Sequence, residues 1–296
     1  MDYFQLKKGI IKIKKDKNPL AYSFLNIIQN IDENKTIKKD ALLKFKDYIN
    51  SKNPIPKDLK DLLLFILQSL HNELNEAKNI NQKSNDCCDK NFGLYYHKYK
   101  NYFKNNYNSI IAKLFYLKYN SETHCFNCDF ISNNIQCTNI LIFPLEEVIK
   151  ENENKKIITI YDCFAYYQKQ NYKIGICNNC KQNDYLANND ILLRGPKILI
   201  INIVGEIKNK MDIKFELDEK IKIKEFFKFK KKEYNYKLIN LISNIGYDHY
   251  IAFCKSFYDN KWYKYNDSSV NESMFKEMKD TGFPYLLFYS LAKNDN

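Results

Sequence analysis

Two pairs of cysteines constrain the fold of this chain more than any other feature of its sequence. Cys125 and Cys128 enclose two residues, as do Cys177 and Cys180. Together the pairs offer four thiolates, the ligand set of a tetrahedral structural zinc site, with the spacing of a zinc knuckle inside each pair. The alternative is four small side chains buried in a core. Because two such pairs rarely arise by chance, the sequence predicts one zinc site that joins two distant segments.

The start of the chain favours the same interpretation. Residues 1–8 contain no apolar run followed by small residues, so we expect no export signal and a location in the cytosol or nucleus. Cysteines in a reducing compartment remain thiols. We expect the unpaired cysteines to be buried thiols; they are Cys87, Cys88, Cys137, Cys163 and Cys254. No apolar stretch approaches the roughly 18 residues that a membrane helix needs, so we expect no membrane partner.

The net charge of +12 raises the question of nucleic acid. Only one of the 47 basic residues is an arginine, Arg194. Arginine is the side chain best suited to grip phosphates and base edges, because its guanidinium binds in a bidentate way. The excess is lysine, and it rises together with Asn and Ile, as in a general drift of composition. Nucleic acid is therefore not the partner that we expect.

The order of the predicted elements is helices first and strands later. Apolar residues at helical spacing predict helices over residues 20–31, with Asn18 and Pro19 at the start, and over about 58–76. Residues 78–108 are interpreted as a loop with a polar helical stretch. Lys and Ile alternate over residues 220–224, as in a strand with one solvated face. Short β-rich runs predict strands at residues 139–143, 157–161, 198–203, 213–217, 236–242, 250–253, 262–265 and 285–289.

A histidine and an asparagine in the last third could form a catalytic pair. A hairpin centred near residues 257–260 would bring His249 and Asn266 together at its open end. The Asn266 side-chain oxygen can accept the proton of one ring nitrogen, which leaves the other nitrogen as a base. The alternative is a half-buried histidine in a sheet.

Several blocks of sequence, in the same order, resemble the ubiquitin-specific protease family. The resemblance extends from Gly9 to Tyr289. The blocks are Asp58-Leu59-Lys60-Asp61-Leu62-Leu63 with Leu70-His71-Asn72-Glu73-Leu74, the two cysteine pairs, Pro196-Lys197-Ile198-Leu199-Ile200-Ile201-Asn202-Ile203, His249-Tyr250-Ile251-Ala252, Trp262-Tyr263-Lys264-Tyr265-Asn266-Asp267-Ser268-Ser269-Val270 and Tyr285-Leu286-Leu287-Phe288-Tyr289.

The resemblance implies an α+β, papain-like cysteine-protease fold shaped like a right hand. It implies one domain over residues 1–296, with a helical thumb over about 1–110, zinc-ribbon fingers over about 111–195 and a β-sheet palm over about 196–296. Ubiquitin or a ubiquitinated protein would be the partner. It also implies catalytic roles for His249, Asn266 and Asp267. Asp58 and Asp61 resemble the carboxylates that bind the arginine-rich tail of ubiquitin; the alternative is ordinary acids in the first turn of a helix.

The nucleophile of the family is missing. Gly9 opens the family's cysteine box and Gln29 closes it, but residues 1–86 contain no cysteine. We expect Ala21 to occupy the position of the nucleophile, with Tyr22 as the alternative if one counts back from Gln29. We expect the asparagine that completes the oxyanion hole in the family to be lost as well, replaced by Lys12 or by a residue of the inserted stretch 14–18. Without a thiolate, the histidine and asparagine have nothing to activate.

Three functions remain open. The chain could be a catalytically inactive relative that binds ubiquitin or a larger protein complex, which the insertion before Ala21 favours. It could be a Cys-to-Ala form of an active deubiquitinase, which the retained His249, Asn266 and Asp267 favour. It could also be a zinc-ribbon scaffold in an RNA-processing complex, an idea that rests on the lysine excess. We favour the first.

Overall fold

The computed structural model describes residues 19–32, 39–51, 56, 58–77, 92–205, 214–230, 233–246 and 249–292. The chain forms two compact units, which are treated separately below. The first comprises residues 1–85 and 93–116, and the second comprises residues 86–92 and 117–296. Helices dominate the first unit and strands the second, as the sequence predicts. Among the described helices, none is long and apolar enough to cross a membrane.

The first unit is helical. The predicted helix over residues 20–31 is α2 (Pro19–Asp32), and the one over about 58–76 is α4 (Leu59–Leu74). α3 (Lys39–Asn50), α5 (Phe92–Asn106) and α6 (Ile110–Phe115) complete the described helices of this region. α4 buries Leu67, Leu70 and His71. Nδ1 of His71 lies 2.6 Å from the Ser109 hydroxyl oxygen, and burial lowers the pKa of this histidine.

One carboxylate connects three of these helices. Glu73 of α4 accepts hydrogen bonds from the backbone N–H groups of Leu20 at 3.2 Å and Ala21 at 2.9 Å. It also accepts one from the Tyr48 hydroxyl of α3 at 3.0 Å. Burial, with this hydrogen bond adding to it, raises the pKa of Tyr48 to about 12. Glu73 therefore satisfies two of the donors that the start of α2 leaves without a helical partner.

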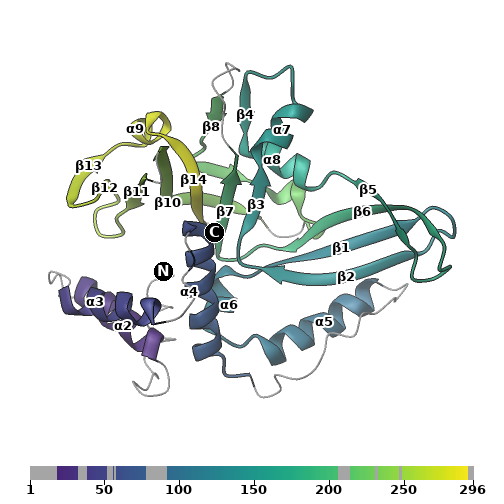
Figure 1. Cartoon of the computed structure of the whole chain (residues 1–296), viewed down its shortest axis with the longest axis horizontal. Coiled ribbons are helices and arrows are strands. Elements are labelled where there is room, and N and C mark those ends of the chain that lie inside the picture. The colour runs from purple at the N-terminus through teal and green to yellow at the C-terminus, as the bar shows by residue number, and fades with distance from the viewer. Residues whose placement is uncertain are drawn as a thin grey trace. The chain divides into compact units, whose positions relative to one another are not determined.

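The second unit is built on an eight-stranded sheet, which we call the palm sheet (Figure 1). Its main path runs in the order β13-β12-β11-β10-β14-β7-β3, and β9 also pairs with β10. β3 runs parallel to β7, and the other pairs are antiparallel. The strands are β3 (Leu141–Pro144), β7 (Ile198–Val204), β9 (Lys220–Lys222), β10 (Asn235–Gly246), β11 (His249–Lys255), β12 (Trp262–Asn266), β13 (Ser269–Ser273) and β14 (Phe283–Leu291).

The main core lies against the palm sheet. α7 (Leu145–Glu151) and α8 (Ile160–Tyr167) contribute to it, and the Phe143 and Phe164 rings meet edge to face at 5.1 Å. The alternation over residues 220–224 is as predicted, because Ile221 and Ile223 are buried while Lys220 and Lys222 face solvent. A buried hydroxyl joins two strands that are distant in sequence. Tyr236 of β10 donates a hydrogen bond to the carbonyl of Pro196, just before β7, at 2.7 Å. A Cβ at Gly195 would lie 2.5 Å from that same hydroxyl, so only glycine fits there.

A second, four-stranded sheet extends away from the palm sheet, and we call it the finger sheet (Figure 1). Its strands are β1 (Leu117–Cys125), β2 (Ile131–Thr138), β5 (Asn171–Ile176) and β6 (Asn183–Arg194), in the order β2-β1-β6-β5. Polar side chains form ladders across it. Asn120 donates to Asn133 at 2.8 Å, and Thr123 donates to Asn188 at 2.8 Å. The sheet is therefore held by hydrogen bonds more than by apolar burial.

Two features of the second unit differ from the sequence expectations. The strand predicted over residues 157–161 ends earlier, as β4 (Ile157–Thr159), which pairs with β8 (Lys214–Glu216). It ends because Thr159 and Asp162 form a reciprocal capping box that begins α8 at Ile160. The predicted strands also omit the whole finger sheet, whose polar composition hides the alternation on which strand prediction depends. The second unit further contains the short helices η1 (Lys224–Phe226) and α9 (Phe275–Asp280).

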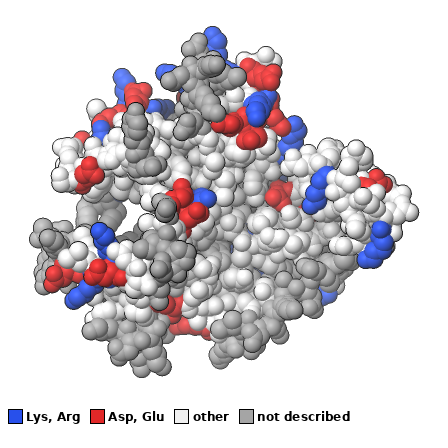
Figure 2. Space-filling view, in the orientation of Figure 1, with Lys and Arg blue, Asp and Glu red and all other residues white. Residues whose placement is uncertain are grey.

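Charges of both signs are mixed on the surface of the described residues (Figure 2). Several lysines of the second unit pair with carboxylates; examples are Lys255 with Glu219, Lys261 with Glu272, and Lys264 with Glu277. Exposed pairs of this kind contribute little to stability. They show that part of the lysine excess is neutralised locally.

The contact of Glu73 predicts a specific loss of stability. Replacing Glu73→Ala leaves two backbone donors and the Tyr48 hydroxyl without this acceptor, so the free energy of unfolding should fall by about 1 to 3 kcal/mol. Glu73→Gln, which keeps one acceptor oxygen, should cost less. Urea denaturation followed by circular dichroism measures both. Gln68→Ala on the exposed side of the same helix is the control, and equal losses in Gln68→Ala and Glu73→Ala would contradict the assignment.

Candidate active site and zinc centre

The four paired cysteines meet at the far end of the finger sheet. The turn between β1 and β2 carries Cys125 and Cys128, and the turn between β5 and β6 carries Cys177 and Cys180. All four sulfur atoms lie within 4.8 Å of one another. Across the two turns, Cys125 and Cys180 are 3.9 Å apart and Cys128 and Cys177 are 3.7 Å apart.

These distances fit a zinc ion. Zn–S bonds of about 2.3 Å in a tetrahedron place the sulfurs about 3.8 Å from one another. N–H groups also point at the sulfurs, since the Asn179 backbone donates to Cys177 at 3.3 Å and the Asn127 side chain donates to Cys180 at 3.6 Å. The backbone N–H of Gln182 and the Asn127 amide lower the pKa of Cys180 to about 6. The four cysteines form a structural zinc site, as the sequence predicts.

The histidine and asparagine of the candidate pair lie on adjacent strands. The predicted hairpin is present, because β11 ends at Lys255 and β12 begins at Trp262. At its open end, His249 Nε2 lies 2.8 Å from Asn266 Oδ1. An amide oxygen can only accept, so Nε2 is the protonated nitrogen and Nδ1 of the neutral ring is left as a base.

Asp267 lies next to this pair. Its backbone has a φ of 50° in the tight turn between β12 and β13, a conformation that aspartate tolerates better than most residues. One carboxylate oxygen lies 3.9 Å from His249 Nε2. That distance is beyond a hydrogen bond, so Asn266 is the hydrogen-bond partner of this nitrogen. The second unit thus brings together the three residues that the resemblance assigned to catalysis.

The position predicted for the missing nucleophile is closed. Ala21 lies in the first turn of α2 with none of its surface exposed, and its N–H is bonded to Glu73. Tyr22, the alternative position, is partly exposed. The Ser23 hydroxyl is buried and donates to the Leu20 carbonyl at 2.8 Å, so it is engaged within the helix. Gly9, Lys12 and the rest of the residues before Pro19 lie outside the described part of the chain.

The two candidate tail-binding carboxylates differ in their surroundings. Asp58 is the N-cap of α4 and accepts from the Asp61 N–H at 3.1 Å. The Asp61 side chain is about half exposed and lies 3.1 Å from Lys60. Helix capping accounts for Asp58 without any ligand, so Asp61 is the better placed of the two to bind an arginine.

Two unpaired cysteines within the described residues, Cys163 and Cys254, are not activated thiols. Burial raises the pKa of Cys163 to about 12 and that of Cys254 to about 11. A catalytic thiol needs the opposite shift. Cys137 lies on β2, and Cys87 and Cys88 fall outside the described residues.

The fold and the site together define the class of protein to which this chain belongs. An α+β chain with an imidazole–amide pair on a palm sheet and a zinc-tipped finger sheet has the architecture of a papain-like cysteine protease of the ubiquitin-specific type. Comparison with known families agrees: the family model described as ubiquitin carboxyl-terminal hydrolase matches residues 2–289. The chain belongs to this family of deubiquitinases.

Individual relatives are distant. The chain is 24% identical over 254 residues to ubiquitin carboxyl-terminal hydrolase 2 of Bos taurus, covering 80% of this chain and 40% of that protein. It is 27% identical over 163 residues to ubiquitin carboxyl-terminal hydrolase 12 of Saccharomyces cerevisiae, covering 49% of this chain and 13% of that protein. The chain therefore spans less than half the length of these relatives.

Solved structures share the fold. A SAGA DUB module of Ubp8, Sgf11, Sus1 and Sgf73 matches with a TM-score of 0.71 and 18% identity, over 98% of this chain and 64% of that chain. A form of this module bound to monoubiquitin matches with a TM-score of 0.68 and 19% identity, over 99% of this chain and 63% of that chain.

Sequence patterns did not reveal the contact of Glu73 with the start of α2. The two segments are far apart in the chain, and a glutamate in a helix carries no local sign of such a partner. The sequence did contain one relevant block, Leu70-His71-Asn72-Glu73-Leu74. That block indicates the family but not the groups that the glutamate binds.

The zinc site makes a prediction about the finger sheet. Purified protein should contain about one zinc ion per chain, and Cys177→Ser should lose it together with thermal stability, because structural zinc contributes folding free energy directly. Metal analysis and thermal denaturation measure this. Cys137→Ser, on β2 of the same sheet but outside the cluster, should keep the zinc. A stoichiometry near zero in protein purified without chelators would contradict the assignment.

Proposed function

We propose that this chain is a catalytically inactive member of its family that binds ubiquitin. The observation that carries the proposal is the start of α2, where the family's nucleophile is expected and no thiol is present. The base and its orienting amide, His249 and Asn266, remain within hydrogen-bonding distance. An imidazole without a thiol to deprotonate cannot start acyl transfer. We therefore expect binding without hydrolysis.

The surroundings of Ala21 bear on which residue is the counterpart of the missing nucleophile. The backbone N–H of the nucleophile's residue commonly stabilises the oxyanion in hydrolases of this type. Here the Ala21 N–H is bonded to a carboxylate, Glu73. A thiolate or oxyanion at Ala21 would need the donor that Glu73 uses and would meet its negative charge. The geometry thus favours Tyr22, which follows these two bonded N–H groups, as the counterpart of the nucleophile.

Two other functions are weighed against this one. In the first, the chain is a Cys-to-Ala form of an active deubiquitinase; the burial of Ala21 and its bond to Glu73 count against it. In the second, the chain is a zinc-ribbon scaffold in an RNA-processing complex, which the mixed charges of the described surface do not favour.

The partners and the location of the chain are also part of the proposal. The SAGA module matched by the fold is an assembly of four proteins, so we include binding within a larger complex. Four cysteines that ligate zinc as thiolates, not as disulfides, suit a reducing compartment, and a location in the cytosol or the nucleus is part of the proposal.

Ubiquitin binding can be tested at one carboxylate. We expect a weak complex, and Asp61→Lys should weaken it by about 1 to 3 kcal/mol if Asp61 binds an arginine of the ubiquitin tail. Calorimetry or NMR titration with ubiquitin measures the effect. Asp58→Asn is the control, because asparagine keeps the helix cap and removes only the charge. No binding by the unmodified chain at high ubiquitin concentration would contradict the proposal and favour the scaffold.

Activity can be tested at the two candidate positions. The unmodified chain should not cleave ubiquitin joined to a fluorescent leaving group, nor react with a thiol-reactive ubiquitin probe. Tyr22→Cys should react with the probe, whereas Ala21→Cys should not, because that side chain is buried. Turnover by Tyr22→Cys should stay low, since one missing oxyanion donor costs about 10²- to 10³-fold in rate.

His249→Ala in the Tyr22→Cys background is the control and should reduce the labelling. Labelling and turnover by Ala21→Cys alone would instead support the Cys-to-Ala alternative. Cleavage by the unmodified chain would show that the nucleophile lies elsewhere, and Cys87 and Cys88 would be mutated first.

A further inference from the structure

The strand β5 leaves one edge of the finger sheet open. Within the described residues it pairs on one side only, with β6, and it forms the end of the strand order β2-β1-β6-β5. Figure 1 shows it as the outermost strand of that sheet. Five of its six residues are exposed. An edge strand of this kind presents a row of backbone N–H and C=O groups to a possible additional strand.

One face of this edge is apolar. Tyr172, Ile174 and Ile176 alternate along β5 and are 62%, 63% and 67% exposed. Tyr185 of β6 lies opposite Ile174 in the register, so it shares this face, and it is 59% exposed. Singly exposed apolar side chains are ordinary, but neighbouring ones on an open strand edge mark an interaction surface. We call these four residues the β5 apolar face.

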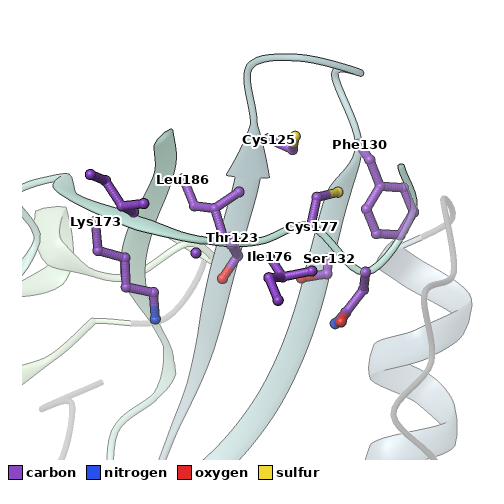
Figure 3. A pocket seen from close by; sticks show the side chains of 11 residues that line it. Thr123, Cys125, Phe130, Ser132, Lys173, Ile176, Cys177 and Leu186 are labelled. Atoms are coloured by element: carbon purple, nitrogen blue, oxygen red, sulfur yellow. The ribbon is translucent and has the colours of Figure 1, made fainter. Parts of the chain in front are cut away.

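A cavity lies beside β5, next to the zinc cysteines. Lys173 of β5 pairs in register with Leu186, which in turn pairs with Cys125, so these side chains share the other side of the sheet. The cavity measures about 430 Å³, and its lining includes Lys173, Thr123 and Ser132 together with Ile174 and Ile176 of the β5 apolar face (Figure 3). Gly175 also lines it and adds no side chain.

The charge of this edge favours an acidic partner protein over a second copy of the chain. Lys173 is exposed, and within the described part of the chain no carboxylate forms an ion pair with it. The whole chain carries a net charge of +12, so a second copy would add to the repulsion while an acidic partner would reduce it. Because side chains alternate along a strand, the partner would place apolar residues toward the β5 apolar face and acidic residues on the side of Lys173.

We propose that β5 binds an extended segment of a partner protein as a fifth, antiparallel strand of the finger sheet, and that this segment alternates apolar and acidic residues. Backbone hydrogen bonds along the open edge provide affinity, and Lys173 provides the preference for acidic side chains. The proposal rests on residues of the second unit around β5 and uses neither His249 nor Asp61.

The test uses two fluorescent peptides and the zinc-loaded full chain. One peptide contains Val-Glu-Val-Glu-Val between serines, and the other contains Val-Lys-Val-Lys-Val in the same frame. Fluorescence anisotropy should show binding of the acidic peptide and at least about three-fold weaker binding of the basic one, the range of an exposed ion pair. Lys173→Glu should reverse this preference. Ile174→Lys should weaken both peptides at least about ten-fold, because it places a charge in the β5 apolar face.

Matched controls separate this surface from general effects. Val270→Lys changes an equally exposed residue on β13, the edge strand of the palm sheet, and should leave peptide binding unchanged. Zinc content measured on every variant checks that the finger sheet is intact.

Three outcomes would overturn the proposal. The first is failure of the acidic peptide to bind. The second is an unchanged preference in Lys173→Glu, which would mean that Lys173 only protects the edge from pairing. The third is concentration-dependent dimerisation in sedimentation equilibrium that Ile174→Lys abolishes, which would assign β5 to a second copy of the chain.

Discussion

The finger sheet depends on four sulfur atoms. Its distal end contains little apolar material, since the buried cluster there consists of Cys125, Cys177 and Leu186. Its two hairpins are joined along β1 and β6, whose residues are distant in sequence and largely polar. The free energy that an apolar core would normally supply has to come from metal coordination. Zinc binding therefore determines whether the finger sheet, which includes β5, is folded.

The parts of the structure that could be predicted from the sequence are those with a local signature. The zinc knuckles depend on the spacing of cysteines within a turn, and His249 and Asn266 meet because a hairpin joins their strands. The helix α2 was predicted from its apolar periodicity and its proline. In each case the interacting residues are either close in sequence or fixed by a ligand set that recurs among proteins.

The parts that could not be predicted depend on distant contacts or on weak patterns. The finger strands are rich in Asn, and polar side chains bond across strands, so β1, β2 and β6 show no clear alternation in sequence. The capping box of Thr159 and Asp162 was visible in the sequence as a Thr-x-x-Asp spacing, but the β-branched run before it favoured a strand. The bond between Glu73 and Ala21 joins two helices, and only the folded chain brings these residues together.

The contact of Glu73 also bears on how this family changes over evolutionary time. A carboxylate that caps one helix and holds a tyrosine of another is needed for folding whether or not a nucleophile follows it. Selection for a stable thumb would preserve such a residue after catalysis is lost, and selection for a stable palm would do the same for the strand that carries His249. Sequence signatures of an enzyme family can therefore outlast the reaction, because some of the signature residues serve the fold and others serve the chemistry.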